Sequence, residues 1–297
     1  LQAGEPPRRR RRPRRATAYQ CILDGGLVAE QFRGAERVGG LEADEVKLLF
    51  DVGGGADKFL RSRPTSAPAT RPAREERERL VLRWNGRLQL TPTAAAPVGE
   101  PNRRRFEARG HPVVLSRGDG HVRCGQVAFH DDTQRVWLYP MEGGTVEFGL
   151  GAKLAAAAQS IYIDRLARIV KLIGNVELRS QRGTGTTARL SAIRCAYWGE
   201  LHIAAGAATT QPTATDDALL TAERLESAVF VGDVQVDLGA QQLTGHRLDV
   251  GFRADAGGQT LEELLDTAQA SGNVRLTSGN GRLECGDLRL VFDLTPS

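Results

Sequence analysis

A short pattern of apolar and small residues recurs along the chain and limits the structures it can form. An apolar residue is followed two positions later by a small or apolar one, and three positions after that by another apolar residue. Residues two apart share one face of a strand, whereas a step of three needs a bulge or corner that absorbs a residue. The copies are Leu41, Ala43, Val46; Val122, Cys124, Val127; Ala156, Ala158, Ile161; Leu190, Ala192, Cys195; Leu220, Ala222, Leu225; Leu243, Gly245, Leu248; and Leu283, Cys285, Leu288. The pattern predicts strands that each bend once.

The last stretch shows the repeating unit most clearly. After Gly272-Asn273, Val274 and Leu276 alternate with polar residues, which is typical of a strand with one apolar face. Gly279-Asn280-Gly281 predicts a tight turn into a second strand, and the spacing of that strand predicts a bend near Gly286. Similar glycine-led strands begin at Gly110, Gly144, Gly174 and Gly232 and precede most copies.

These units predict an all-β chain of repeated β-hairpins stacked into an elongated, solenoid-like structure. Copies beginning at 122, 156 and 190 are 34 residues apart, a period that helical tetratricopeptide repeats also show. The period-two alternation and the glycine in every unit exclude helices here. Asn85-Gly86 is a strong hairpin-turn signal, and Leu261–Ala268 is the one segment that predicts a turn or two of helix.

Composition divides the chain into a tail and one long β-repeat domain. Residues 1–17 are rich in Arg and Pro and are expected to be disordered, and residues 18–297 form the domain. Within the domain, 53–79 is predicted to be an inserted loop and 91–105 a linker. The net charge is +4, but residues 1–15 carry seven Arg and one Glu (+6), so the remainder carries −2.

The tail has two interpretations. Arg8–Arg15 is either an anion-binding arm for an anionic surface or a solvated linker, and charge runs are more often the latter. No aromatic residue interleaves the arginines, so specific nucleic-acid binding is not expected. No apolar run approaches the roughly 20 residues of a membrane helix. The chain starts at Leu1, so we expect a signal peptide or anchor to be missing from it.

The cysteines also have two interpretations. Cys124 and Cys285 occupy positions that other copies fill with Ala or Gly, which favours small buried side chains. Four cysteines in an oxidising compartment also permit disulfides between successive units. Neither Cys–His spacing nor a CxxC motif indicates a metal site, so no metal is expected.

The chain shows no motif for catalysis. Its five histidines fall in different units, and Gly183-Thr184-Gly185 lacks the Lys-Ser/Thr and the strand-to-helix context of a phosphate loop. A catalytic site needs convergent titratable groups, so we expect a protein that is not an enzyme and holds no cofactor.

What remains is the apolar face of the repeats, made of branched aliphatic residues with an occasional aromatic. It is either a dry core between facing sheets or a partly open groove along which acyl chains lie. The candidate groove residues are Val176, Leu178, Ile193, Val234, Val236, Leu248, Val250, Phe252, Val274, Leu276, Leu288, Leu290 and Phe292.

The combination of Gly-Asn-Val strands with this second-strand pattern resembles the OstA-like (organic solvent tolerance) family of periplasmic lipopolysaccharide-transport proteins. The motifs most similar to that family are Gly174–Leu178, Gly272–Leu276, and the strands Leu41–Asp51 and Leu283–Asp293, each ending in Phe-Asp. The resemblance implies a twisted, partly open β-jellyroll, or β-taco, whose interior shields acyl chains.

The resemblance also implies a function and a location. We expect non-enzymatic binding and transfer of lipopolysaccharide or another acylated glycolipid along the groove, bridging the periplasm. Partners would be further copies joined end to end, or other envelope transport proteins. The alternative is a structural β-solenoid scaffold with a dry core that assembles end to end.

Overall fold

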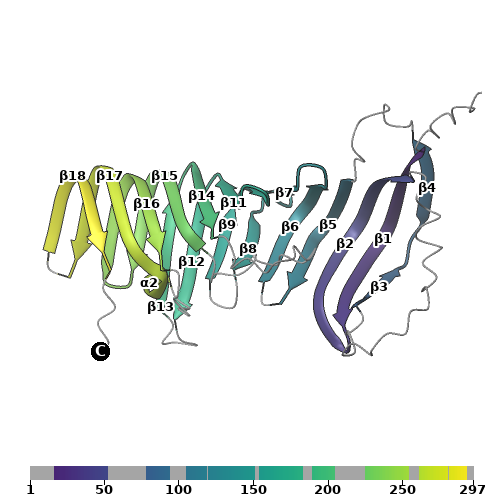
Figure 1. Cartoon of the computed structure of the whole chain (residues 1–297). Helices are drawn as coiled ribbons and strands as arrows, with labels where there is room; N and C mark the ends of the chain where they lie inside the picture. The colour runs from purple at the N-terminus through teal and green to yellow at the C-terminus, as the bar shows by residue number, and fades with distance from the viewer. Residues whose placement is uncertain are drawn as a thin grey trace, which may run out of the picture.

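The protein forms one elongated antiparallel sheet, shown in Figure 1 as a ladder of strands. The structure is a computed structural model that describes residues 17–52, 78–93, 105–118, 120–150, 154–182, 189–204, 225–253, 261–279 and 281–292. These residues contain 18 strands and the helix α2 (Leu261–Leu264). The expected all-β class is therefore confirmed.

Long, bent strands form both ends of the chain, and β3, β4 and the middle strands β7 to β14 are shorter. The strands are β1 (Thr17–Arg33), β2 (Glu36–Val52), β3 (Glu78–Trp84), β4 (Leu88–Thr93), β5 (Arg105–Arg117), β6 (Gly120–His130), β7 (Arg135–Tyr139), β8 (Val146–Leu150), β9 (Leu154–Ala158), β10 (Ser160–Asp164), β11 (Ile169–Ile173), β12 (Val176–Arg182), β13 (Arg189–Cys195), β14 (Trp198–Ile203), β15 (Leu225–Leu238), β16 (Gln241–Phe252), β17 (Leu265–Ser278) and β18 (Gly281–Val291). Strands β3, β4 and β5 show that the expected insertion and linker are shorter than 53–79 and 91–105. The remainder of both, and the tail before Thr17, lies outside the described residues.

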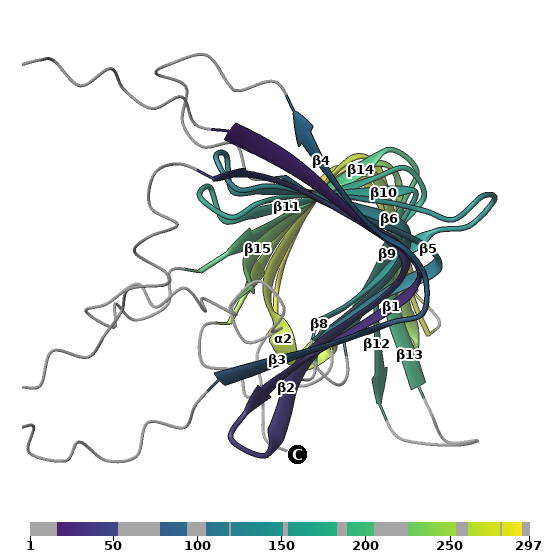
Figure 2. The same ribbon diagram turned by 90° about the vertical axis from the view of Figure 1, so that its right-hand side faces the viewer.

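The strands form six successive antiparallel hairpins. These are β1 with β2, β5 with β6, β7/β8 with β9/β10, β11/β12 with β13/β14, β15 with β16, and β17 with β18. In the two middle hairpins a bent strand is divided into two short ones. Viewed along the ladder, the two arms of each strand form two walls that meet at the bend (Figure 2).

The Asn85-Gly86 turn is not a hairpin, contrary to the sequence prediction. Strands β3 and β4 both pair with β1, β3 with its second half and β4 with its first. Asp24 accepts a hydrogen bond from the Arg87 N–H (2.7 Å) and donates its own N–H to Arg87 O (3.1 Å). Asn85-Gly86 is therefore the corner of one more bent strand, which lies at the end of the ladder.

The predicted glycines form the corners. Gly110, Gly232 and Gly272 lie within bent strands, whereas Gly144 and Gly174 precede β8 and β12 as predicted. In the last hairpin Ser271 pairs with Asp287 and Val274 with Cys285, so Gly272 and Asn273 together oppose Gly286. Both residues have positive φ, 78° and 56°. The bend expected near Gly286 is therefore present, and the extra residue is in β17. β17 begins at Leu265, so only the first half of the helix expected at 261–268 is helical.

Replacing Gly272 with alanine is expected to destabilise the last hairpin by about 1–2 kcal/mol, the cost of a left-handed backbone for an L-residue. An added Cβ would also lie 2.8 Å from the His246 Cβ. The Gly286→Ala variant is the matched control, because its Cβ would meet nothing within 4 Å. Chemical denaturation of both variants checks this, and equal stabilities would contradict the assignment of the corner.

Apolar residues pair across the whole ladder and line its interior. One row runs Leu82, Ala29, Leu41, Leu115, Val122, Phe148, Ala156, Leu178, Ile193, Val236, Leu243, Leu276 and Leu283, each paired with the next. The sequence copies at 41, 122, 156, 243 and 283 all fall on this row. The copy at Leu190 does not, since Ile193 and Cys195 take the equivalent positions. Leu220 lies outside the described residues.

Helix α2 packs its leucines into the interior of the C-terminal half. Leu261 and Leu264 are buried, and the Leu261 N–H donates to the buried Ser180 Oγ on β12 (2.7 Å). The Arg253 side chain donates to Leu265 O (2.8 Å) and to Phe292 O, tying the ends of β16, β17 and β18 together. The short helix therefore completes the core between the walls.

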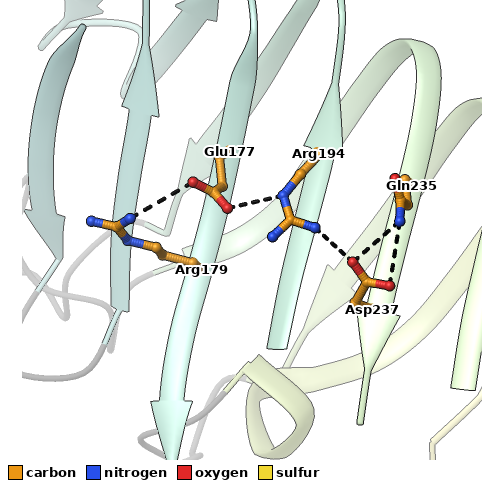
Figure 3. Close-up of polar contacts among 5 residues, drawn as sticks. All are labelled: Glu177, Arg179, Arg194, Gln235 and Asp237. Atoms are coloured by element: carbon orange, nitrogen blue, oxygen red, sulfur yellow. Dashed lines mark hydrogen bonds and ion pairs between the residues drawn. The ribbon is translucent and has the colours of Figure 1, made fainter. Parts of the chain in front are cut away.

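The outer face carries charged residues that pair across neighbouring strands. Arg194 on β13 contacts Glu177 on β12 (2.9 Å) and Asp237 on β15 (2.6 Å), and Arg179 and Gln235 extend the row (Figure 3). Such partly exposed pairs contribute about 0.2–1 kcal/mol each. They support strand register on the face opposite the apolar rows.

Candidate functional site

The residues that carry reactive chemistry do not come together in the described part of the chain. The histidines are spread over four strands, with His121 and His130 at opposite ends of β6. His111 lies beside Asp44 and His202 beside Glu200. Among the described residues no group of three or more His, Cys, Asp or Glu side chains is placed to hold a metal.

All four cysteines are free thiols, so the disulfide interpretation is wrong and the small-residue interpretation holds for two of them. Cys124 and Cys195 are buried, and Cys21 and Cys285 are half-buried. Burial raises the pKa of the Cys124 thiol to about 12, and burial also raises the pKa of Cys195. Because the thiolate is the nucleophile, neither buried side chain is set up for catalysis.

A partly buried carboxylate on the outer face, that of Asp164, is expected to give the chain an acid response. The Ala167 N–H donates to Asp164 Oδ1 (2.9 Å) and lowers the pKa of Asp164, and Tyr162 and Arg135 lower it further. A carboxyl group whose pKa is lower in the folded than in the unfolded protein stabilises the fold at pH values above its unfolded pKa, near 4. This stabilisation is lost as the pH falls through the pKa of the folded state.

The Asp164→Asn variant is therefore expected to be less stable than the parent protein at neutral pH. Acidification below about pH 4 should lower the unfolding free energy of the variant by less than that of the parent. Urea unfolding at a series of pH values measures this. Parallel acid curves for the two proteins would show that Asp164 titrates normally.

The thirteen predicted groove residues all face the interior, and most are fully buried. Val176, Leu178, Ile193, Val234, Val236, Leu248, Val250, Phe252 and Val274 are buried, and Leu276, Leu288, Leu290 and Phe292 are partly buried. Several of them, with Leu265 of β17, surround a space of about 20 Å³. One water needs about 10–15 Å³ on the same measure, so no acyl chain enters here without displacing side chains.

A far larger apolar space lies at the other end of the ladder. We call it the N-terminal chamber. Its volume is about 460 Å³, and it is lined by residues of β1, β2, β3 and β5: Leu23, Leu27, Ala29, Gln31, Gly39, Gly40, Leu41, Val46, Leu48, Leu80, Leu82, Phe106, Leu115, Ser116 and Arg117. None of these belongs to the predicted groove set. The structure thus places a lipid-sized space outside the groove that the sequence predicted.

Small residues and the end of the sheet create the chamber. In the main interior row the small residue Ala29 occupies the position that Leu41 and Leu115 fill on the next strands. Gly39 pairs with Gln31 on one side and Arg117 on the other, and it has no side chain to fill the space between them. Leu80 and Leu82 on β3 are 64% and 46% exposed although they face inward. The opening is therefore walled by apolar side chains that water can reach.

One side of the opening is polar. Gln31, Ser116 and Arg117 lie where the arms of β1, β2 and β5 end, and Gln31 and Arg117 each pair with Gly39. Arg117 is the ionisable residue among the described residues that line the chamber. The chamber therefore combines an aliphatic interior with a polar, cationic edge, the polarity of a site for an amphiphile.

Comparison with protein-family models, with curated proteins and with solved structures gives no match. The resemblance to the OstA-like family therefore stays a prediction from the Gly-Asn-Val and second-strand motifs of the sequence. Among the described residues, no helix is both long and apolar enough to cross a membrane.

Proposed function

We propose that this protein binds the acyl part of an amphiphile in the N-terminal chamber and carries it in the cell envelope without catalysing a reaction. The observation that carries the proposal is the aliphatic space of about 460 Å³ that opens beside Leu80 and Leu82. The OstA-like motifs support an acylated amphiphile as the class of ligand and the periplasm as the location.

The chamber suits reversible binding. Removing a CH₂ group from water gains about 0.8 kcal/mol, so a chain of about a dozen carbons gains roughly 10 kcal/mol before ordering costs. Part of that gain is lost because the lining leucines Leu80 and Leu82 stay partly exposed to water. A ligand that must be released needs this moderate affinity, whereas a fully enclosed core would retain the ligand.

The two ends of the ladder favour association with other chains. Within the described residues β18 pairs with β17, and β3 and β4 pair with β1, so each end presents an unpaired strand edge. Such edges bind further strands, and we propose end-to-end self-association or pairing with another β-rich envelope protein. Association of Arg8–Arg15 with an anionic surface stays a prediction.

Titration with a dansyl-labelled fatty acid tests the proposed function. We expect saturable binding of one probe per chain and a rise in unfolding free energy of about 2.7 kcal/mol at a probe concentration 100 times Kd. A titration without saturation, together with an unchanged melting temperature, would remove the carrier proposal.

The second candidate function is a scaffold, and the packed interior from β6 to β17 favours it. A dry, rigid ladder with two open edges needs no ligand to assemble. Filaments that form with rising protein concentration, combined with native mass spectra that show no bound or added lipid, would establish the scaffold and exclude the carrier.

A further inference from the structure

The size of the N-terminal chamber limits what it can hold. A buried cavity of about 150 Å³ binds one benzene, a molecule of six carbons. The chamber of about 460 Å³ is three times larger, so it accommodates on the order of 18 carbons. That is the volume of a single long acyl chain and far less than a glycolipid with several chains requires.

The chamber is closed on the side that faces the rest of the ladder. Leu115 lines the chamber, and its partner on β6, Val122, is 3% exposed. Val122 pairs in turn with Phe148, which is fully buried. Beside them, Cys124 and Val127 of β6 are buried as well. Side chains of β6 and β8 therefore form a floor, and the chamber does not continue as a groove.

Among the described residues, the interior further along is packed and shows no second route. The space around Val236, Leu248 and Leu290 holds about 20 Å³, and Leu261 and Leu264 of α2 are packed into the core there. A ligand in the chamber therefore enters and leaves at the β3 end.

The polar edge indicates the head group. Arg117 and Gln31 flank the side-chain-free position of Gly39, and Ser116 lies next to them. A guanidinium hydrogen-bonds a carboxylate or a phosphate more strongly than a neutral group. With the aliphatic interior beyond, the arrangement fits an acidic head attached to one chain.

We propose that the ligand of this protein is an acidic amphiphile with one long acyl chain, held in a blind chamber with a single mouth at the β3 end. The inference rests on the proposed function and specifies the ligand of the same site. In this proposal the ligand does not move along the ladder; it enters and leaves the chamber at the same opening. Fatty acids and monoacyl phospholipids share the required chemistry.

Displacement of the dansyl-labelled fatty acid from the full chain tests the inference. The competitors are saturated fatty acids of 10 to 24 carbons, a monoacyl and a diacyl phospholipid with chains of 16 carbons, and a hexa-acylated lipid A. We expect affinity to rise about three- to fourfold per methylene and to stop rising near 18 carbons. The monoacyl phospholipid should bind at one per chain and the lipid A at least tenfold more weakly. Comparing fatty acid with monoacyl phospholipid distinguishes the two sources of the acidic head.

If the chamber is blind, the Leu41→Trp variant should change the acyl-chain length at which affinity stops rising. A larger side chain on the wall should lower the optimal length by several carbons, whereas the Leu283→Trp variant, on the same interior row at the far end, should leave the series unchanged. Affinity that keeps rising beyond 22 carbons, or tighter binding of lipid A, would overturn the blind chamber and leave the carrier proposal standing. If no acyl probe binds, the proposed function fails as well.

Discussion

Replacement of Leu82 by glutamate is expected to weaken acyl-chain binding at least tenfold, equivalent to about 1.4 kcal/mol or more. Leu82 lines the N-terminal chamber from β3, and a carboxylate there must either lose its hydration to a bound acyl chain or exclude that chain. Because Leu82 is 46% exposed without a ligand, the variant folds with little penalty. The dansyl fatty-acid titration measures the effect.

The Thr91→Glu variant is the matched control, since Thr91 is exposed on the neighbouring edge strand β4 and does not line the chamber. It adds the same charge and should bind as the parent protein does. Equal binding by all three proteins would place the ligand elsewhere.

Truncation of Phe230 to alanine is expected to destabilise the fold by about 3–5 kcal/mol, the range for a fully buried aromatic residue. Phe230 on β15 has no exposed surface, and its ring lies over Gly199, where an added Cβ would come within 2.9 Å of it. The surrounding structure relaxes only partially into such a cavity, so the melting temperature should fall by on the order of 10 °C.

The Val291→Ala variant on β18 is the comparison, because Val291 is mostly exposed and its truncation should change stability by less than about 0.5 kcal/mol. Fatty-acid affinity should be the same in the folded forms of both variants, since neither residue is near the chamber. A loss of below 1 kcal/mol for Phe230→Ala would mean that the interior of the ladder is not tightly packed.

The sequence predicted the fold because its signals are local. Gly272-Asn273 adopts positive φ, which glycine and asparagine tolerate best, and the alternation of Val274 and Leu276 needs only a neighbouring strand. Asn85-Gly86 misled the prediction for the same reason. The dipeptide specifies a sharp turn, and whether the flanking strands pair with each other or with β1 depends on residues far away in the chain.

The candidate site could not be predicted in the same way. Leu41 and Leu243 occupy equivalent positions in equivalent motifs, and Leu243 is buried while Leu41 stays half-buried beside an open space. The difference comes from what lies across the interior and from the position of Leu41 near the end of the ladder. The only residues in the sequence that indicated the chamber were the small residues Ala29 and Gly39. They are weak indicators, because glycine also forms turns and corners throughout this chain.

Photo-crosslinking from two interior positions tests most directly whether acyl chains occupy the N-terminal chamber. A benzophenone side chain at Leu48 lies on the chamber wall, and one at Val250 lies in the packed C-terminal half. With a radiolabelled long-chain fatty acid, Leu48 should crosslink to the lipid and Val250 should not. Labelling from Val250 with none from Leu48 would contradict binding in the N-terminal chamber and would indicate that the lipid binds in the groove predicted from the sequence.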